Sequence, residues 1–289
     1  PLVHTLDLYD SSYEKAKSAL VRIGTPAVDT LILHLKDGTI RNKAFMAEDL
    51  GSIGDNKAVP YLCSSLLNDD DKVKIASAAA LGDIGDKEAV PVLCKVLEGS
   101  YSDPVRISAV ESLKLINDPS SVPFLTVSLN SDGDRVNLAI LNALEVMKKV
   151  DNPTSVIPLL NSSNPAVRAS AATVLGVAET EEAVEPLITI MEDEDDKVRL
   201  EAVKALGNTG DPRAVEALVK RLYDKKQVVQ AAVVRALGKI GEPSVEPLIK
   251  LLRTEHAFIN FYVINSLAHV GKPAIAPMIA LLKDKDNTV

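Results

Sequence analysis

Residues 200–222 read LEAVKALGNTGDPRAVEALVKRL, and two other stretches follow the same pattern. Residues 76–97 read ASAAALGDIGDKEAVPVLCKVL, and residues 230–252 read QAAVVRALGKIGEPSVEPLIKLL. In each stretch a leucine precedes the first glycine, and this marker leucine recurs along the chain at spacings of 30 to 32 residues. A fixed period of this length predicts a chain built from internal repeats. The marker leucines are Leu20, Leu50, Leu81, Leu113, Leu144, Leu175, Leu206, Leu237 and Leu267.

Each repeat is expected to contain two helices. Apolar or small residues lie eight, four and three positions before the marker leucine, as at Val198, Ala202 and Val203, which is one face of a helix. A glycine that accepts a positive φ ends this first helix, and a second helix such as 183–188 follows with proline in its first turn. The residue just before the marker is small in almost every repeat, so first helices should pack between neighbours. We expect an all-α solenoid of about nine such repeats of about 31 residues.

Composition narrows the class of protein. The 289 residues are 46% hydrophobic but only 3% aromatic, so the core must consist of Ala, Val, Leu and Ile. A net charge of −8 argues against a general nucleic-acid coat or a protein that binds anionic membranes. Two cysteines exclude a disulfide-rich scaffold, and no apolar run approaches the roughly 18 residues of a membrane span. Because the first residues lack the pattern of a signal peptide, we expect a cytoplasmic protein.

The recurring string D-x-x-V-R-x-x-A-x-x-A-L-G-x-I-G-D-x-x-A-V-x-P-L resembles the HEAT-like repeat of phycobilisome lyase subunits and of many other proteins. It is best matched by residues 71–97, 164–191, 196–222 and 226–252. The resemblance implies a right-handed α-α superhelix whose second helices line a concave face. It implies little about function, because such solenoids serve unrelated tasks.

Some segments depart from the pattern. Residues 1–6 match a second helix and residues 284–289 match the start of a first helix, so we expect one repeat domain over 1–289 that is cut mid-repeat at both ends. The repeats at Leu113 and Leu144 lack turn glycines. We therefore expect the helix at Leu144 to continue to Val150, and a possible change of curvature around 114–163.

Apolar residues on the second helices are the first candidate for a partner-binding surface. Tyr61, Val92 and Phe124 occupy equivalent first-turn positions in successive repeats, and Val127 lies one turn after Phe124. Large apolar residues on an exposed groove are typical anchors for a protein partner. The alternative is that they pack against the neighbouring repeat. Phe261 lies six residues before its marker leucine, where other repeats carry apolar residues, and is expected to be half-buried.

Segregated charge gives the second candidate surface. Residues 164–194 carry a net charge of −6, whereas residues 213–253 carry +5, including Lys220, Arg221 and Arg235. One interpretation is a patch that attracts an acidic partner; the other is pairing within the molecule. The acidic run 192–196 lacks the pattern of a calcium loop and is expected to cap the next helix. Nucleic-acid binding is disfavoured because aromatic residues do not alternate with the basic ones.

The sequence offers no catalytic, metal or cofactor site. It contains no phosphate-binding glycine loop, no nucleophile elbow and no Cys-x-x-Cys. Cys63 and Cys94 occupy equivalent positions that elsewhere hold Ile or Val, so we expect small buried hydrophobic residues. Some HEAT-like proteins are di-iron hydroxylases with His-Glu pairs, and this chain has no His-Glu dipeptide.

These observations favour a non-enzymatic scaffold that presents a concave surface to a protein or peptide partner. The candidate partner-binding residues are Tyr61, Val92, Phe124, Val127, Lys220, Arg221 and Arg235. A chromophore (bilin) lyase-type subunit, which the resemblance permits, is one alternative. A nucleic-acid-binding HEAT-like protein is a further alternative.

Overall fold

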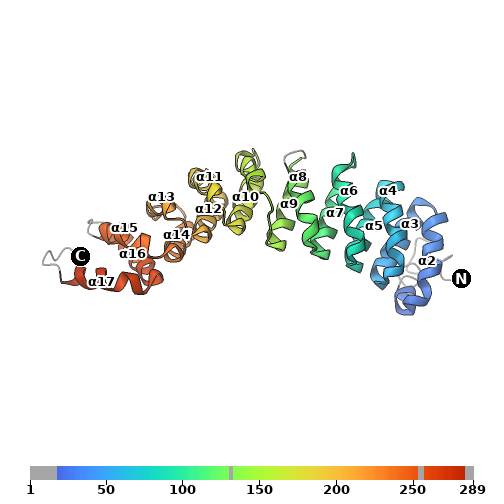
Figure 1. Ribbon diagram of the computed structural model, residues 1–289, viewed down its shortest axis with the longest axis horizontal. Coiled ribbons are helices and arrows are strands. Elements are labelled where there is room, and N and C mark those ends of the chain that lie inside the picture. Colours follow the sequence, from blue (N-terminus) through green and yellow to red (C-terminus); the bar gives the residue numbers. More distant parts are fainter. Residues whose placement is uncertain (1–17, 130–132, 253–256, 284–289) are drawn as a thin grey trace. The chain divides into compact units, whose positions relative to one another are not determined.

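A computed structural model describes residues 18–129, 133–252 and 257–283, with the side chains of 257 and 258 excepted. In these ranges the chain forms successive helices and no strand, which confirms an all-α solenoid of two-helix repeats (Figure 1). The chain divides into two compact units, Pro1–Asp151 and Asn152–Val289. Their boundary falls within 114–163, where a change of curvature stays a prediction. The segments expected to be incomplete repeats, 1–6 and 284–289, lie outside the described residues.

Each unit consists of two layers of helices. In the first unit the first helices are α3 (Ile40–Ile53), α5 (Asp71–Ile84), α7 (Asp103–Ile116) and α9 (Asp134–Met147). The second helices are α2 (Thr25–Asp37), α4 (Val59–Asn68), α6 (Val90–Glu98) and α8 (Val122–Ser128). Short 3-10 turns precede the last three, namely η2 (Asn56–Ala58), η3 (Lys87–Ala89) and η4 (Pro119–Ser121).

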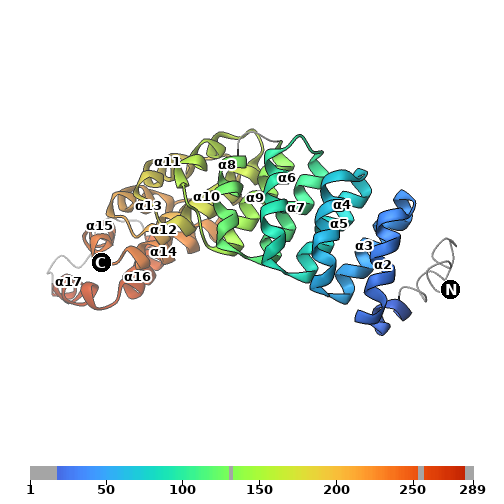
Figure 2. The same ribbon diagram turned by 45° about the vertical axis from the view of Figure 1, so that its right-hand side comes forward.

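The second unit repeats this arrangement (Figure 2). Its first helices are α10 (Pro165–Ala178), α12 (Asp196–Thr209), α14 (Gln227–Ile240) and α16 (Ala257–Val270). Its second helices are α11 (Val184–Ile190), α13 (Val215–Arg221), α15 (Val245–Leu252) and α17 (Lys272–Leu282), and the 3-10 segment η6 (Ile157–Asn161) takes the place of another. The connecting turns are η5 (Pro153–Ser155), η7 (Glu181–Ala183), η8 (Pro212–Ala214) and η9 (Glu242–Ser244).

The ends of the first helices follow from their capping residues. The Asp195 side chain caps α12 by accepting from the backbone N–H of Lys197 at 2.8 Å. This confirms the predicted role of the acidic run. Gly85 and Gly210 end α5 and α12 with φ of 75° and 66°, as the glycine pattern predicts.

Helices without a terminal glycine end at the same register. Asn117, Lys148 and Glu179 adopt φ of 53°, 52° and 50° at the ends of α7, α9 and α10. The expectation that the helix at Leu144 continues to Val150 is therefore wrong, because α9 ends at Met147. A left-handed conformation costs a non-glycine residue about 1–2 kcal/mol. The Lys148 N–H nevertheless donates to the carbonyls of Leu144 and Glu145 and so caps the helix. The turn that follows α9, and not the residue type at its end, therefore fixes where the helix stops.

The core lies between the two layers, and all nine marker leucines are buried in it. First helices of successive repeats also approach one another closely, through glycine on one helix and a small residue on the next. A Cβ atom on Gly207 would lie 2.8 Å from the Cα atom of Ala236, and one on Gly176 would lie 2.6 Å from that of Ala205. This confirms the expectation that small residues let first helices pack between neighbours.

The close approach decides which layer is on the inside of the curve within each unit. First helices of adjacent repeats contact one another extensively, whereas adjacent second helices contact one another sparsely and leave a groove between α13 and α15. In a two-layer stack, the layer with the shorter spacing lies on the inner side. The first helices therefore form the inner layer of each unit, and the expectation that second helices line the concave face is wrong.

Phe261 is also placed differently from the expectation. Its side chain is 69% exposed on α16, and its ring meets the neighbouring Tyr262 ring edge to face. In preceding repeats of this unit the equivalent side chains are half-buried, and a further first helix packs against the helix that carries each of them. Among the described residues α16 is the last helix of that layer, so its face has no such cover.

Replacing Gly207 by alanine should lower the free energy of unfolding by about 1–3 kcal/mol, because the new methyl group meets the Ala236 backbone and forces α12 and α14 apart. Urea denaturation followed by circular dichroism measures the change. Lys197→Ala is the matched control, since Lys197 is exposed on the same helix and its side chain forms no ion pair with any described residue. Equal stability of the two variants would contradict the close approach.

Candidate functional site

The predicted apolar residues lie on the second helices of the first unit. Tyr61 is on α4, Val92 is on α6, and Phe124 and Val127 are on α8. Val127 is 81% exposed and Phe124 is 39% exposed, whereas Tyr61 and Val92 are half-buried. The α8 helix thus presents its residues to solvent, whereas the earlier helices partly cover theirs, and a partner-binding role stays a prediction. We call this set the outer stripe.

Tyr61 already has a partner within the chain. The Lys36 ammonium group lies 4.4 Å from the centre of the Tyr61 ring, in a cation–π contact. The ring also borders a pocket of about 250 Å³ that includes Ser64 and the ion pair between Lys43 and Asp69. The exposed part of the outer stripe is thus centred on α8.

A second apolar pair, which the sequence analysis missed, lies on the inner layer. Leu115 of α7 is 60% exposed and Val146 of α9 is 54% exposed. Both lie two residues after a marker leucine, where Ser52 and Asp83 stand in earlier repeats. The change from polar to apolar residues at this repeat position is visible in the sequence and could have predicted an exposed apolar pair.

The three predicted basic residues do not form one patch. Lys220 is exposed on α13, in the outer layer, whereas Arg235 is exposed on α14, in the inner layer. Arg221 is half-buried and pairs with Glu192 and, at 3.5 Å, with the Asp224 carboxylate. Arg221 thus follows the alternative interpretation, pairing within the molecule.

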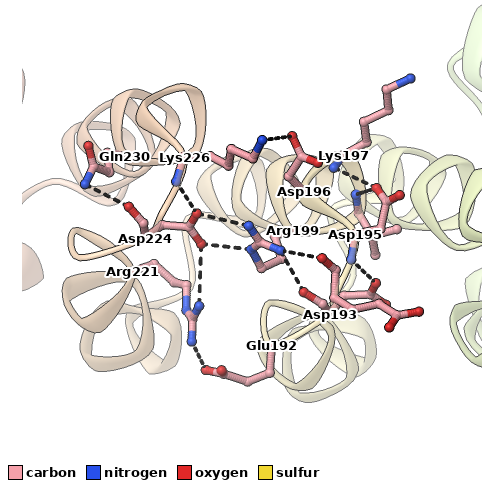
Figure 3. A network of polar contacts seen from close by, with 12 residues as sticks. Glu192, Asp193, Asp195, Asp196, Lys197, Arg199, Arg221, Asp224, Lys226 and Gln230 are labelled. Carbon is pink, nitrogen blue, oxygen red and sulfur yellow. Dashed lines mark hydrogen bonds and ion pairs between the residues drawn. The ribbon is translucent and has the colours of Figure 1, made fainter.

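Arg221 belongs to a polar network that joins the loops between repeats (Figure 3). At its centre the Arg199 guanidinium donates two hydrogen bonds to the Asp224 carboxylate, at 2.8 and 3.1 Å, and both side chains are buried. Arg199 also donates to the backbone carbonyls of Asp193 and Glu194. Asp224 accepts from the backbone N–H of Lys226 at 2.9 Å.

The preceding repeat contains an equivalent pair. Arg168 lies 31 residues before Arg199, and it binds the Asp193 carboxylate through two hydrogen bonds of 2.8 Å. In the following repeat Gln230 takes the arginine position and donates to the Asp224 carbonyl at 2.9 Å. The network therefore follows the repeat and has a structural role.

The network also sets the ionisation of its carboxylates. Burial alone would raise the pKa of Asp224, but hydrogen bonds from Arg199 and from the Lys226 N–H outweigh it and lower that pKa below its ordinary value of 3.8. The pKa of Asp193 is lowered in the same way, against burial, by Arg168 and by the Asp195 N–H. Both groups therefore favour the folded state when ionised.

Replacing Asp224 by asparagine should destabilise the protein by about 3–5 kcal/mol at neutral pH, because Arg199 would stay buried without a counter-charge. A carboxyl whose pKa is lowered on folding stabilises the protein above its unfolded pKa and loses that contribution as the pH falls. Wild-type stability should therefore decline below about pH 4, with a shallower decline in the variant. Urea denaturation at several pH values tests both expectations.

The control is Glu201→Gln, which removes a partly exposed pair with Lys204. Such surface pairs contribute about 0–1 kcal/mol. A loss for Asp224→Asn as small as the loss for this control would contradict a buried structural pair.

The two cysteines are free thiols on α4 and α6. Cys94 is buried and Cys63 is half-buried, so the expectation of small buried hydrophobic residues holds fully for Cys94. Burial, with smaller contributions from nearby carboxylates, raises the pKa of Cys63 to about 11 and that of Cys94 to about 12. A thiol with so high a pKa is a weak nucleophile at neutral pH.

Both thiols should therefore react with iodoacetamide at pH 7.5 far more slowly than an unperturbed cysteine. Mass spectrometry of the native protein should show little alkylation over a time in which the urea-denatured chain is fully modified. Rapid alkylation of native Cys63 would contradict the raised pKa.

The described part of the chain contains no group of three or more His, Cys, Asp or Glu residues positioned to hold a metal ion. None of its helices is long and apolar enough to cross a membrane.

Comparison with known proteins agrees with this repeat architecture. A family model described as HEAT repeats matches residues 28–114, 65–145, 153–229 and 215–289. The chain belongs to the HEAT-repeat family. No curated protein sequence matches the chain.

Several solved structures are similar to the chain, and two of them share its fold with TM-scores of 0.60 or more. An engineered protein is 21% identical with a TM-score of 0.62, over 99% of this chain and 95% of its own. The Escherichia coli protein YibA is 19% identical with a TM-score of 0.60, over 92% of this chain and 98% of its own. The complex of CpcE and CpcF of phycocyanin lyase from Nostoc is 20% identical with a TM-score of 0.45, over 84% of this chain and 94% of that one.

Proposed function

We propose that this chain is a non-enzymatic scaffold of HEAT repeats that binds a protein partner through the outer stripe of its first unit. The observation that carries the proposal is the exposure of Phe124 and Val127, at 39% and 81%, on the short helix α8. Exposed apolar side chains next to half-buried ones of the same kind are typical of protein-binding surfaces. Tyr61 and Val92 extend the stripe along α4 and α6.

The chemistry of the described residues supports a binding role over a catalytic one. The two most buried ion pairs, Arg168 with Asp193 and Arg199 with Asp224, hold loops together through two hydrogen bonds each. The thiol pKa values are raised, which is the opposite of an activated nucleophile. Basic groups are split between two layers, which disfavours a continuous nucleic-acid track.

Affinity capture from a lysate of the source cell tests the proposal. The test variant is Phe124→Ala with Val127→Ser, which removes the exposed apolar surface of α8. The matched variant is Leu115→Ser with Val146→Ser, which changes an equally exposed pair on the inner layer. Circular dichroism checks that both variants keep the helical content of the wild type.

We expect a partner that the wild type and the inner-layer variant retain, and that the outer-stripe variant loses at least tenfold. The opposite pattern would place binding on the concave inner layer and would refute the outer stripe. Bilin absorbance of the captured material would instead support the chromophore lyase-type alternative. Retention by both variants would remove both apolar surfaces from consideration.

A further inference from the structure

A groove of about 400 Å³ lies between α13 and α15, on the outer layer of the second unit. We call it the α13–α15 groove. Its floor is formed by half-buried apolar residues, Val219 of α13 with Pro247 and Leu251 of α15. Its rims carry exposed charged residues, which are Glu216, Lys220, Glu246 and Lys250.

These charges occupy equivalent positions in consecutive repeats. Glu216 and Glu246 are 30 residues apart, and so are Lys220 and Lys250. Because successive repeats have the same order of elements, α13 and α15 run in the same direction. Both glutamates therefore lie at one end of the groove and both lysines lie one turn later, about 6 Å along the helices. The groove thus has an acidic end, a basic end and an apolar floor.

The rim charges are not used within the chain. In the described residues, the four rim side chains form no hydrogen bond or ion pair, although a glutamate four residues before a lysine is the favourable order for pairing on a helix. Arg221, next to Lys220, differs because it is held by Glu192 and Asp224. The rim charges are therefore available to a partner.

We propose that the α13–α15 groove binds a helix of a partner protein in which an acidic residue stands four positions before a basic one, with an apolar residue between them. The inference rests on the proposed protein-binding function and names a second contact for it. The partner's basic group must lie over the glutamates and its acidic group over the lysines. A helical pair four residues apart has the same rise of about 6 Å, so one such pair reaches both ends of the groove.

The direction of the partner helix follows from the helix dipoles. An antiparallel helix places its own dipole opposite those of α13 and α15, which is the favourable arrangement. In that direction the acidic residue is reached first along the partner sequence, at the lysine end. The same order of charges also stabilises an isolated helix, so the partner segment is partly formed before it binds.

Partners of a single charge sign fit this groove poorly. An acidic peptide or a nucleic acid would meet Glu216 and Glu246 at one end, and a basic peptide would meet Lys220 and Lys250 at the other. An apolar segment without charges would leave both ends unpaired. A helix with one acidic and one basic residue can pair with the lysines and the glutamates while its apolar residue packs on the floor of the groove.

Three synthetic helical peptides test this proposal. They share the same leucines and differ only at two positions, four residues apart, that face the rims of the groove. The mixed peptide has an acidic residue followed by a basic one at these positions, the second peptide has two acidic residues, and the third has two basic residues. Binding is followed at low salt by the methyl NMR signals of Val219 and Leu251. The mixed peptide should shift these signals and bind at least tenfold more tightly than the other two. A spin label on its C-terminus should broaden signals near Glu216, as the antiparallel direction requires.

Charge reversal in the protein should switch this preference. Lys220→Glu with Lys250→Glu makes both ends acidic, so the doubly basic peptide should become the tightest ligand. Lys204→Glu with Lys239→Glu makes the same change in charge on the inner layer and should leave the wild-type preference unchanged.

The proposal is overturned if no peptide shifts Val219 and Leu251 at millimolar concentration, or if the doubly acidic peptide binds as well as the mixed one. Tighter binding of a single-stranded oligonucleotide at this groove would also overturn it. These outcomes leave the outer stripe untouched, because its test changes only Phe124 and Val127 in the other unit.

Discussion

The distance between first helices of adjacent repeats is the constraint on which the structure depends. Where Gly176 faces Ala205, or Gly207 faces Ala236, the two helices lie so close that the glycine position has no room for a side chain. A bulkier residue at either position would separate the helices. The close contact explains why only 3% of the residues are aromatic, since rings fit poorly between such helices. It also explains why the first-helix layer is the denser one and lies on the inner side of the curve in each unit.

The repeat period and the positions of small residues were enough to predict the helices, most of their ends and the buried marker leucines. These features depend on residues close together in the chain. The sequence analysis failed where the spacing of neighbouring helices within a layer decides the outcome. It placed the second helices on the concave side, because the resemblance supplied that detail and no residue pattern measures the distance between helices. It also ended α9 too late, because Lys148 adopts a backbone conformation that its residue type does not favour.

The candidate surfaces show the same limit. Counting charges along residues 213–253 joins Lys220 and Arg235, although α13 and α14 expose them on different layers. The residues of the outer stripe do fall on one layer, because equivalent positions on successive second helices lie next to one another in a solenoid; their role in binding stays a prediction. Leu115 and Val146 share this property on the inner layer, but they lie on first helices, where the sequence analysis placed no candidate apolar surface. In a repeat protein, residues should therefore be compared by repeat position and layer before they are grouped into a surface.

The polar network around Arg199 has a consequence for how the second unit unfolds. Asp193 accepts hydrogen bonds from Arg168 through its carboxylate and from Arg199 through its backbone carbonyl. In the next loop, Asp224 accepts hydrogen bonds from Arg199 through its carboxylate and from Gln230 through its backbone carbonyl. Each loop is thus shared by two neighbouring repeats. Opening one repeat would separate a buried guanidinium group from the carboxylate that the next repeat supplies, at a cost of several kcal/mol. The contacts of a solenoid are local, so its repeats can in general unfold one at a time from an end. The shared loops couple these repeats, which should therefore unfold together as one cooperative block.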